Sequence, residues 1–284
     1  MSLDLSAVGH RTAPFTFEYD WKTTVLYALG VGATRDELDY LYEARGPLVL
    51  PSFAVVPAYP ALAPLVERAN ADMTKVVHGA QTIRLHAPIP PMGRLETTGT
   101  IEGIYDLKRL SQVVFSTRTE QDGQLLFETE WTLVVRDTGG FGGPRPPKQS
   151  VPKIPTDTAP LFQVTARTSP EQALLYRLSG DLNPLHADPE FARAVGFEQG
   201  PLLHGLCTFG YVTRAVVAEA CAGDPRRLRA LGVQFKKPVW PGETLRTVGY
   251  AVDDKIALET FAEDRPEAVV GGAWADIAPA GAPA

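Results

Sequence analysis

The chain has 284 residues, of which 44% are hydrophobic and 21% are charged, the balance of a soluble globular protein with one large or two medium domains. Its net charge of −6, which no block of Lys and Arg offsets, argues against general nucleic-acid binding. Two cysteines exclude a disulfide framework, and together with five scattered histidines they offer no zinc-site spacing.

The N-terminal segment, residues 1–21, lacks the basic start and the apolar run of a signal peptide. No apolar segment reaches the roughly 18 residues needed to span a bilayer. The C-terminal residues do not form a Ser-Lys-Leu peroxisomal targeting signal. We therefore expect a cytoplasmic protein without a membrane span.

The first half begins with a strand and a turn, which lead to one helix and then to several strands. Pro57, Pro60 and Pro64 fall within the predicted helix. Proline inside a helix removes a hydrogen bond and bends the chain, so we expect this helix to be kinked or broken.

Two strands, predicted at 112–118 and 125–136, flank Asp122-Gly123, a dipeptide typical of a tight hairpin. A glycine-rich run lies at 139–143, but no helix pattern follows it, so it is a loop rather than a phosphate-binding motif. Residues 144–160 are dense in proline and lack apolar periodicity, which predicts an extended linker.

The second half repeats the first. Pro88-Ile-Pro-Pro91 recurs as Pro238-Val-Trp-Pro241, shifted by 150 positions, and Leu26-Tyr27-Ala-Leu29 recurs as Leu175-Tyr176-Arg-Leu178, shifted by 149. The repeat and the linker divide the chain into two predicted domains, 1–148 and 149–284.

A short helix is predicted after Asp188, which is a suitable N-cap. Pro189 takes the first helical position, where its missing N–H costs nothing, and Gly196 suits the C-terminal cap. The apolar face predicted for this helix consists of Phe191, Ala194 and Val195.

A longer helix is predicted from Gly205 to Ala222, because its apolar residues recur at helical spacing. Cys207 and Cys221 fall within it, and the simplest interpretation is two small buried side chains. A helix and an antiparallel sheet, occurring twice, make an α+β fold. Strands are predicted after this helix at 231–236, 244–252, 256–261 and 268–277.

Asp181, Asn183 and His186 stand within six residues on the irregular turn before the short helix. Asp and Asn-Pro are common turn residues, so these side chains could serve the turn alone. An acid and an imidazole of different intrinsic pKa can also act together as proton donor and acceptor. The N–H of Gly205, at a helix start, has no partner within the helix and suits a developing oxyanion.

The order of these residues resembles a known family. Tyr-x-Leu-Ser-Gly-Asp-x-Asn-Pro-Leu-His at 176–186, followed by Pro-x-Leu-His-Gly-Leu-Cys-Thr at 201–208, resembles the signature of MaoC-like, R-specific enoyl-CoA hydratases (hydratase 2). Segments 25–33 and 78–95 resemble the other half of the same family, so the resemblance covers nearly the whole chain. One residue more than the family pattern stands in the loop near Gly200.

The resemblance implies a double hotdog, two antiparallel sheets that each wrap a central helix. It implies that Asp181 and His186 act in acid–base catalysis and that Asn183 positions the water. It also implies that the N–H of Gly205 donates a hydrogen bond to the thioester oxygen. It implies no cofactor and no metal, since the coenzyme A thioester is the substrate, and it suggests a homodimer.

The first half lacks this set of residues, because the repeat partner of Asp181 is Gly32 and no imidazole follows it before His78. We therefore expect the first domain to be non-catalytic. Its kinked helix either bends for packing or moves aside for a long acyl tail.

Lys236, Lys237 and Trp240 stand together at a strand end. They could bind the phosphates and adenine of coenzyme A, or they could be solvated lysines beside a packed Trp. A packing or hydrogen-bonding role is expected for His78 and His86. His204, beside Gly205, could be catalytic, but a capping or loop role is the expected one.

We therefore predict reversible, (R)-specific hydration of trans-2-enoyl-CoA to (3R)-hydroxyacyl-CoA. Two alternatives stay open. A hotdog thioesterase would need a carboxylate at the thioester carbonyl, and an acyl-CoA-binding subunit without activity would result if the longer loop displaced Gly205.

Overall fold

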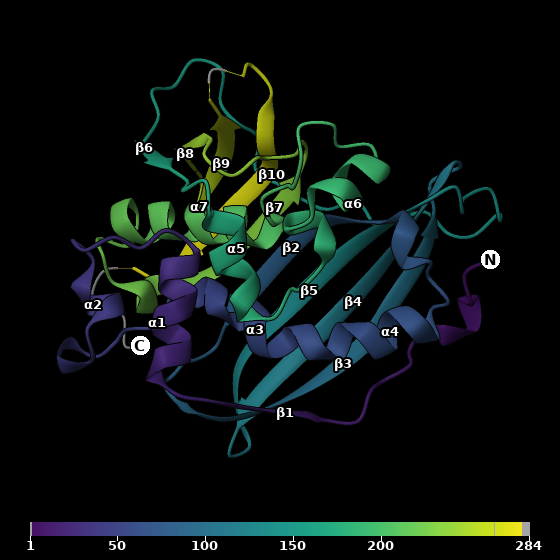
Figure 1. The fold of residues 1–284 in the computed structure, drawn as a ribbon, viewed down its shortest axis with the longest axis horizontal. Coiled ribbons are helices and arrows are strands. Elements are labelled where there is room, and N and C mark those ends of the chain that lie inside the picture. Colours follow the sequence, from purple (N-terminus) through teal and green to yellow (C-terminus); the bar gives the residue numbers. More distant parts are fainter. Residues whose placement is uncertain (1, 264, 280–284) are drawn as a thin grey trace.

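The computed structural model describes residues 2–263 and 265–279, whose strands form one ten-stranded antiparallel sheet (Figure 1). The strand order is β1-β3-β4-β5-β2-β7-β10-β9-β8-β6. The strands are β1 Phe15–Tyr19, β2 Val76–Leu85, β3 Gly93–Asp106, β4 Leu110–Gln121, β5 Gln124–Arg136, β6 Phe162–Arg167, β7 Leu228–Phe235, β8 Thr244–Val252, β9 Lys255–Ala262 and β10 Ala268–Ile277.

The sheet shows the internal repeat directly. Each half contributes five strands, and the order outward from the centre is the same in both: β2, β5, β4, β3, β1 in one and β7, β10, β9, β8, β6 in the other. The halves meet where β2 pairs with β7, from Ala80 opposite Gln234 to Arg84 opposite Ala230. This arrangement confirms the predicted α+β, double hotdog fold. The proposed boundary at 148/149 falls in the stretch between β5 and β6 and stays a prediction.

The helices pack against one face of the sheet, where α3 and α4 cross β3 and β4, and α7 lies against β7 and β8 (Figure 1). The helices are α1 Trp21–Gly30, α2 Leu38–Leu41, α3 Val55–Ala58, α4 Leu62–Arg68, α5 Gln172–Tyr176, α6 Pro189–Ala194 and α7 Gly205–Glu219.

The first-half helix is broken, as its prolines predict. Two α-helical pieces, α3 and α4, are separated by the 3₁₀ turn Tyr59–Ala61, and another 3₁₀ turn, Pro51–Ala54, precedes them. Its counterpart α7 has no proline and runs unbroken for 15 residues. The two equivalent central helices therefore differ in shape because of their proline content.

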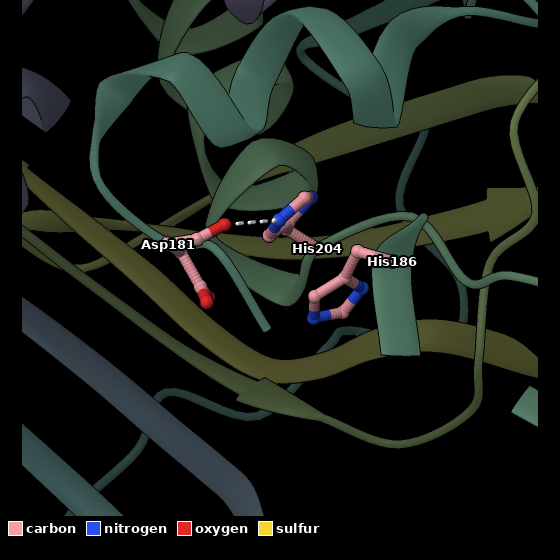
Figure 2. A group of neighbouring side chains, drawn as sticks. All are labelled: Asp181, His186 and His204. Carbon is pink, nitrogen blue, oxygen red and sulfur yellow. Dashed lines mark hydrogen bonds between the residues drawn. The ribbon is translucent and has the colours of Figure 1, made fainter. Parts of the chain in front are cut away.

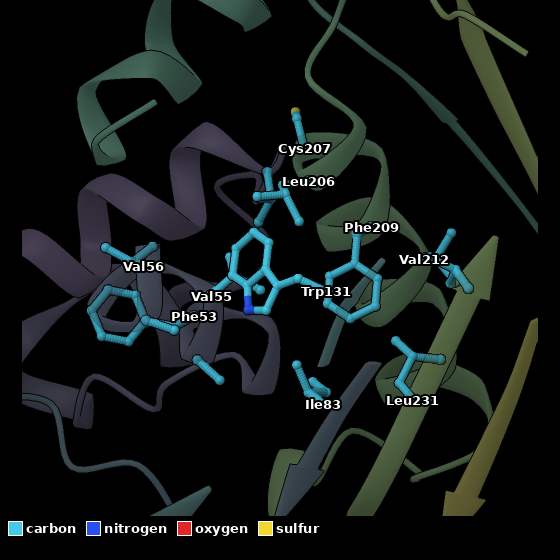
Figure 3. Packing of buried hydrophobic residues seen from close by; sticks show 14 of the residues in the cluster. Phe53, Val55, Val56, Ile83, Trp131, Leu206, Cys207, Phe209, Val212 and Leu231 are labelled. Carbon is cyan, nitrogen blue, oxygen red and sulfur yellow. The ribbon is translucent and has the colours of Figure 1, made fainter. Parts of the chain in front are cut away.

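The core fills the space between helices and sheet and is shared by both halves (Figure 3). Phe53 and Trp131 of the first half lie in one buried cluster with Phe209 of α7 and Leu231 of β7. All four side chains are at most 1% exposed. Among the described residues, no helix combines the length and the apolar character needed to cross a membrane.

Two details differ from the sequence-based expectations. The prediction of the apolar face of α6 was wrong. Ala192 is the buried residue of this helix, while Phe191 is 40% exposed and Ala194 is also exposed. A helix of six residues has too few turns for periodicity to identify the packed face. Helix α7 ends at Glu219, so Cys221 lies beyond it, although both cysteines are buried and free as expected.

A buried group of polar contacts joins the end of α1 to the second half. The side-chain amide of Gln172 donates to the carbonyl groups of Leu29 (3.1 Å) and Gly30 (2.7 Å). The Tyr211 hydroxyl donates to Gln172 Oε1 (2.9 Å), and the Cys207 thiol donates to the Gly30 carbonyl (3.3 Å). Carbonyls at a helix end need such partners when water is excluded.

An ion pair crosses the same junction. Arg214 of α7 donates from Nε to Glu37 Oε1 (3.1 Å) and from Nη1 to the carbonyl of Val31 (3.2 Å), and its Nη2 contacts Glu37 Oε2. The side chains are only 13% and 28% exposed. Glu37 lies in the first-half segment that corresponds to the Asp181 turn, so this carboxylate is engaged in structure.

Replacing the cation should destabilise the chain, because Glu37 would keep its charge in a partly buried position with the hydrogen bonds from Thr34 but without a cation. We expect Arg214→Met to lower the free energy of unfolding by about 2 kcal/mol in urea titrations. The double variant Glu37→Gln/Arg214→Met should recover most of this loss. Arg226→Met, which breaks an exposed pair, is the control and should cost at most about 0.5 kcal/mol. Equal losses for Arg214→Met and Arg226→Met would contradict a role for the ion pair in joining the halves.

Candidate active site

The turn that carries Asp181 and Asn183 is held by its own side chains. Asp181 Oδ1 accepts the N–H of Asn183 (3.2 Å), and Asn183 Oδ1 accepts the N–H of Leu185 (3.0 Å), which caps the 3₁₀ turn Pro184–His186. Gly180, with a φ of +120°, turns the chain into this segment. Both side chains therefore serve the turn, yet the second Asp181 oxygen and the Asn183 amide nitrogen remain available for other contacts.

The imidazole of His186 is oriented by the backbone. Its Nδ1 lies 2.9 Å from the carbonyl oxygen of Leu202. A carbonyl can only accept, so Nδ1 carries the proton and Nε2 of the neutral ring presents a lone pair. Burial lowers the pKa of His186, although the nearby Asp181 charge opposes the shift. The neutral ring at neutral pH is therefore a base with a free Nε2.

His204 lies against this imidazole. The two rings stack with their centroids 3.7 Å apart, and His204 Nε2 donates to the backbone carbonyl of Asp181 (3.1 Å). Burial and the neighbouring His186 lower the pKa of His204 to about 3, so it is neutral. The residue takes the N-cap position of α7, but its side chain makes no capping bond. It instead holds the backbone of Asp181 and one face of His186, a role that the sequence analysis missed.

The three side chains form one cluster (Figure 2). Asp181, His186 and His204 each place a potential ligand atom within 4.8 Å of the others. One carboxylate and two neutral imidazoles could bind a divalent metal. Each imidazole, however, already donates one ring nitrogen to a backbone carbonyl, so only the other nitrogen of each ring is available.

Gly205 is the first residue of α7, next to this cluster. Its N–H is one of the amides that a helix leaves unpaired at its start. A Cβ at Gly205 would lie 3.4 Å from the Phe235 ring. Gly200, in the preceding loop, has a φ of +99°. His204 nevertheless reaches Asp181, so the longer loop still brings the start of α7 to the turn.

Aromatic side chains of the first half border the cluster. His78 stacks on Trp131 at 5.3 Å, meets the Phe235 ring edge-on at 5.0 Å, and contacts the carbonyl of Ala80 through Nε2 (3.0 Å). Burial lowers the pKa of His78 to about 4. The expected packing and hydrogen-bonding role describes His78, whereas His86 forms a half-exposed pair with Glu128 (2.9 Å).

The three residues that were expected to contact coenzyme A already contact other side chains of the chain. Lys236 donates to Gln234 (2.6 Å), Lys237 pairs with Glu267 (2.7 Å), and the guanidinium of Arg265 lies 5.6 Å from the centre of the Trp240 ring. The neighbouring Val239 carbonyl accepts the N–H of Leu203 (2.8 Å). This segment therefore borders the loop before His204, but a ligand would have to displace the contacts of these three side chains.

A cavity of about 1220 Å³ lies elsewhere, between outward-facing side chains of β3, β4 and β5 and linker residues 146–151. Lys236 contributes to its lining, and neither Asp181 nor His186 does. The cluster of Asp181, His186 and His204 does not line this cavity.

The low pKa of His78 predicts a pH dependence of stability. Between pH 6.5 and pH 4 the unfolded chain takes up a proton at residue 78 that the folded chain does not. The free energy of unfolding therefore falls as the pH is lowered through this window. We expect His78→Gln to remove about 2 kcal/mol of this fall, measured by urea titrations at both ends of the window. Identical pH slopes for the variant and the wild type would contradict the assignment of a partly buried, neutral imidazole.

Comparison with known proteins gives consistent matches over both halves. Residues 151–267 match the family model described as MaoC like domain, and residues 17–137 match the model described as MFE-2 hydratase 2 N-terminal domain. The 3-hydroxyacyl-thioester dehydratase Y of Mycobacterium tuberculosis is 39% identical over 95% of this chain and 96% of its own length.

Two further proteins are similar over nearly their full lengths. The peroxisomal enoyl-CoA hydratase 2 of Arabidopsis thaliana is 34% identical, over 95% of this chain and 94% of its own. The crystal structure of a MaoC-like dehydratase from Phytophthora capsici superposes with a TM-score of 0.87 at 26% identity, over 98% of each chain.

Proposed function

Since this chain belongs to the MaoC-like hydratase 2 family, we propose that it is an R-specific enoyl-CoA hydratase. This hydro-lyase adds water reversibly to trans-2-enoyl-CoA and forms (3R)-hydroxyacyl-CoA. The observation that carries the proposal is the pairing of the Asp181 carboxylate with the unprotonated Nε2 of His186 beside the N-terminus of α7.

The proton transfers follow from this geometry. Water held between Asp181 and His186 loses a proton to this pair as its oxygen attacks C3, and the pair delivers a proton to C2. The free amide of Asn183 orients the water. If the hydroxyl and the hydrogen reach the same face of the alkene, the addition is syn. The product is the 3R alcohol when that face is the one that gives the R configuration at C3, so the proposed specificity depends on which face the bound substrate presents to the water.

Gly205 has a different task, which is to stabilise negative charge. As water adds to C3, charge develops on the thioester oxygen, and the N–H at the start of α7 donates to it. Because the donor is a backbone group in a helix, it needs no reorganisation during the reaction.

The remaining features of the proposal concern binding and surroundings. An acyl-CoA is the proposed substrate, and the chemistry requires no cofactor or metal. The broken helix α3–α4 is the proposed place for the acyl tail. Two expectations stay predictions: a homodimer and a cytoplasmic location, the latter against a relative whose name says peroxisomal.

Replacing either member of the pair should abolish most of the activity. We expect Asp181→Asn and His186→Gln each to lower kcat about 10²–10⁴-fold, the range for a positioned proton transfer. The assay follows the ultraviolet absorbance of the enoyl thioester with crotonyl-, octenoyl- and dodecenoyl-CoA, and a 3R-specific dehydrogenase reads the product. His86→Gln, at a surface pair, is the matched control and should stay active.

The outcomes separate the alternatives. Release of free coenzyme A without loss of the alkene would favour a thioesterase. Tight acyl-CoA binding without turnover by the wild type would favour a binding subunit. Full activity of Asp181→Asn would contradict the proposed mechanism.

The N–H of Gly205 can be removed without altering the helix. His204 has φ −59° and ψ 136°, the conformation that a residue before proline adopts. Proline is also well tolerated at the first helical position. We expect Gly205→Pro to lower kcat about 10²–10³-fold while the free energy of unfolding changes little. Gly205→Ala keeps the N–H and is the control; equal losses in both variants would contradict the oxyanion role.

A further inference from the structure

The register of the central strand pair shows a two-fold relation between the halves (Figure 1). The halves are offset by 150 positions, so that Ala80 corresponds to Ala230 and Arg84 corresponds to Gln234. This relation turns the pair Ala80–Gln234 into the pair Ala230–Arg84, and β2 and β7 form both pairs. The surroundings of His186 therefore have a counterpart in the first half, at the other end of these two strands.

A second cavity, of about 350 Å³, lies at this counterpart position. Leu85, the last residue of β2, lines it and corresponds to Phe235, the last residue of β7. Leu228 also lines it and corresponds to His78. In the other half, Phe235 and His78 meet edge-on at 5.0 Å beside the cluster that contains His186. The cavity therefore takes the place in the first half that this cluster takes in the second.

The walls of this cavity are apolar. They come from three segments, 47–51, 85–91 and 225–229, and consist mainly of proline and aliphatic side chains. A hydrogen bond holds one wall in place, because the Tyr19 hydroxyl donates to the Pro90 carbonyl (2.7 Å). The volume lies at the small end of the range of ligand pockets, about 300–1,000 Å³. A preformed cavity of this size and character suits an aliphatic chain.

The charged side chains of the cavity are cationic. None of the described residues that line it is acidic or a histidine, and its charged residues are Arg226 and Arg229. The Arg226 side chain is 54% exposed, so its guanidinium lies where the cavity meets solvent. It already pairs with Asp224 (2.8 Å), and a bound anion would share the guanidinium with this carboxylate. A guanidinium beside an apolar cavity favours a ligand with a carboxylate or phosphate head group.

We propose that this cavity is a second binding site, which holds an aliphatic acyl chain with an anionic head group and does not catalyse its hydration. The equivalent place in the second half is the proposed site of an acyl thioester, and this copy has apolar walls and cations without an acid or an imidazole. The kind of ligand thus rests on the proposed hydratase function. The two places are separated by the length of β2 from His78 to Leu85, roughly 20 Å, so both can be occupied at once.

The test is photoaffinity labelling of the full chain with decanoic acid that carries an aliphatic diazirine, and with its coenzyme A thioester. Both probes lack the alkene that the proposed reaction hydrates. After illumination and digestion, mass spectrometry should locate the label in segments 47–51, 85–91 or 225–229, and excess decanoate should suppress it. Labelling of these segments by the acid alone would identify a site for free fatty acids, whereas labelling by the thioester would identify a site for acyl-CoA.

Two variants test the walls and the charge. Ala87 lines the cavity and is partly buried, so Ala87→Phe should fill the space and lower the label in these segments about tenfold. Ala71→Phe is the matched control, at a partly buried alanine that does not line the cavity, and should leave the label unchanged. Arg226→Met should lower labelling by the acid about threefold, as expected for a solvent-exposed ion pair, and should not affect labelling by the uncharged methyl ester.

Urea titrations show whether each variant is folded. Label spread over the surface, or equal label in Ala87→Phe and Ala71→Phe when both are folded, would overturn the second site. The hydration of crotonyl-CoA by the wild type is a separate measurement, and its absence would contradict the proposed function rather than the binding of a chain in this cavity.

Discussion

The carbonyl of Gly30 accepts hydrogen bonds only from side chains of the other half of the chain among the described contacts, and the position of the turn that carries Asp181 depends on this constraint. Gln172 and Cys207 supply those donors. The approach is close, because a Cβ at Gly30 would lie 3.4 Å from the Cα of Tyr176. Tyr176 precedes Asp181 by five residues, so the contact that completes α1 also sets where the reactive turn begins.

The duplication explains how one half can carry the proposed catalytic residues while the equivalent segment of the other half has a structural role. Both halves keep the same strand order, so both offer a turn and a helix start at equivalent places. In the first half the acid of that turn region, Glu37, is neutralised by Arg214. In the second half Asp181 has no such cation among its described contacts and faces two neutral imidazoles instead. The same architecture thus gives one carboxylate a structural role and leaves the other available for the proposed proton transfer.

Much of this could be predicted from the sequence, and the limits have physical reasons. The strands at 244–252 and 268–277 agree with β8 and β10 because alternation along a strand is a local signal. Asp181, Asn183 and His186 come together because they share one turn. The stacking of His204 on His186 joins residues that are distant in sequence, and no local pattern encodes it. The partners of Lys237 and Trp240 escaped prediction for the same reason.

The thiol of Cys207 has a chemical consequence for an enzyme that handles conjugated alkenes. Such alkenes are electrophiles, and a thiolate can add to them and so alkylate the protein that carries it. Cys207 stands two residues after Gly205, close to the proposed path of the substrate. Burial raises its pKa well above the usual range, and its hydrogen is directed to the Gly30 carbonyl. Because the thiolate is the reactive form, burial and the hydrogen bond to Gly30 keep this thiol in its protonated, less nucleophilic form.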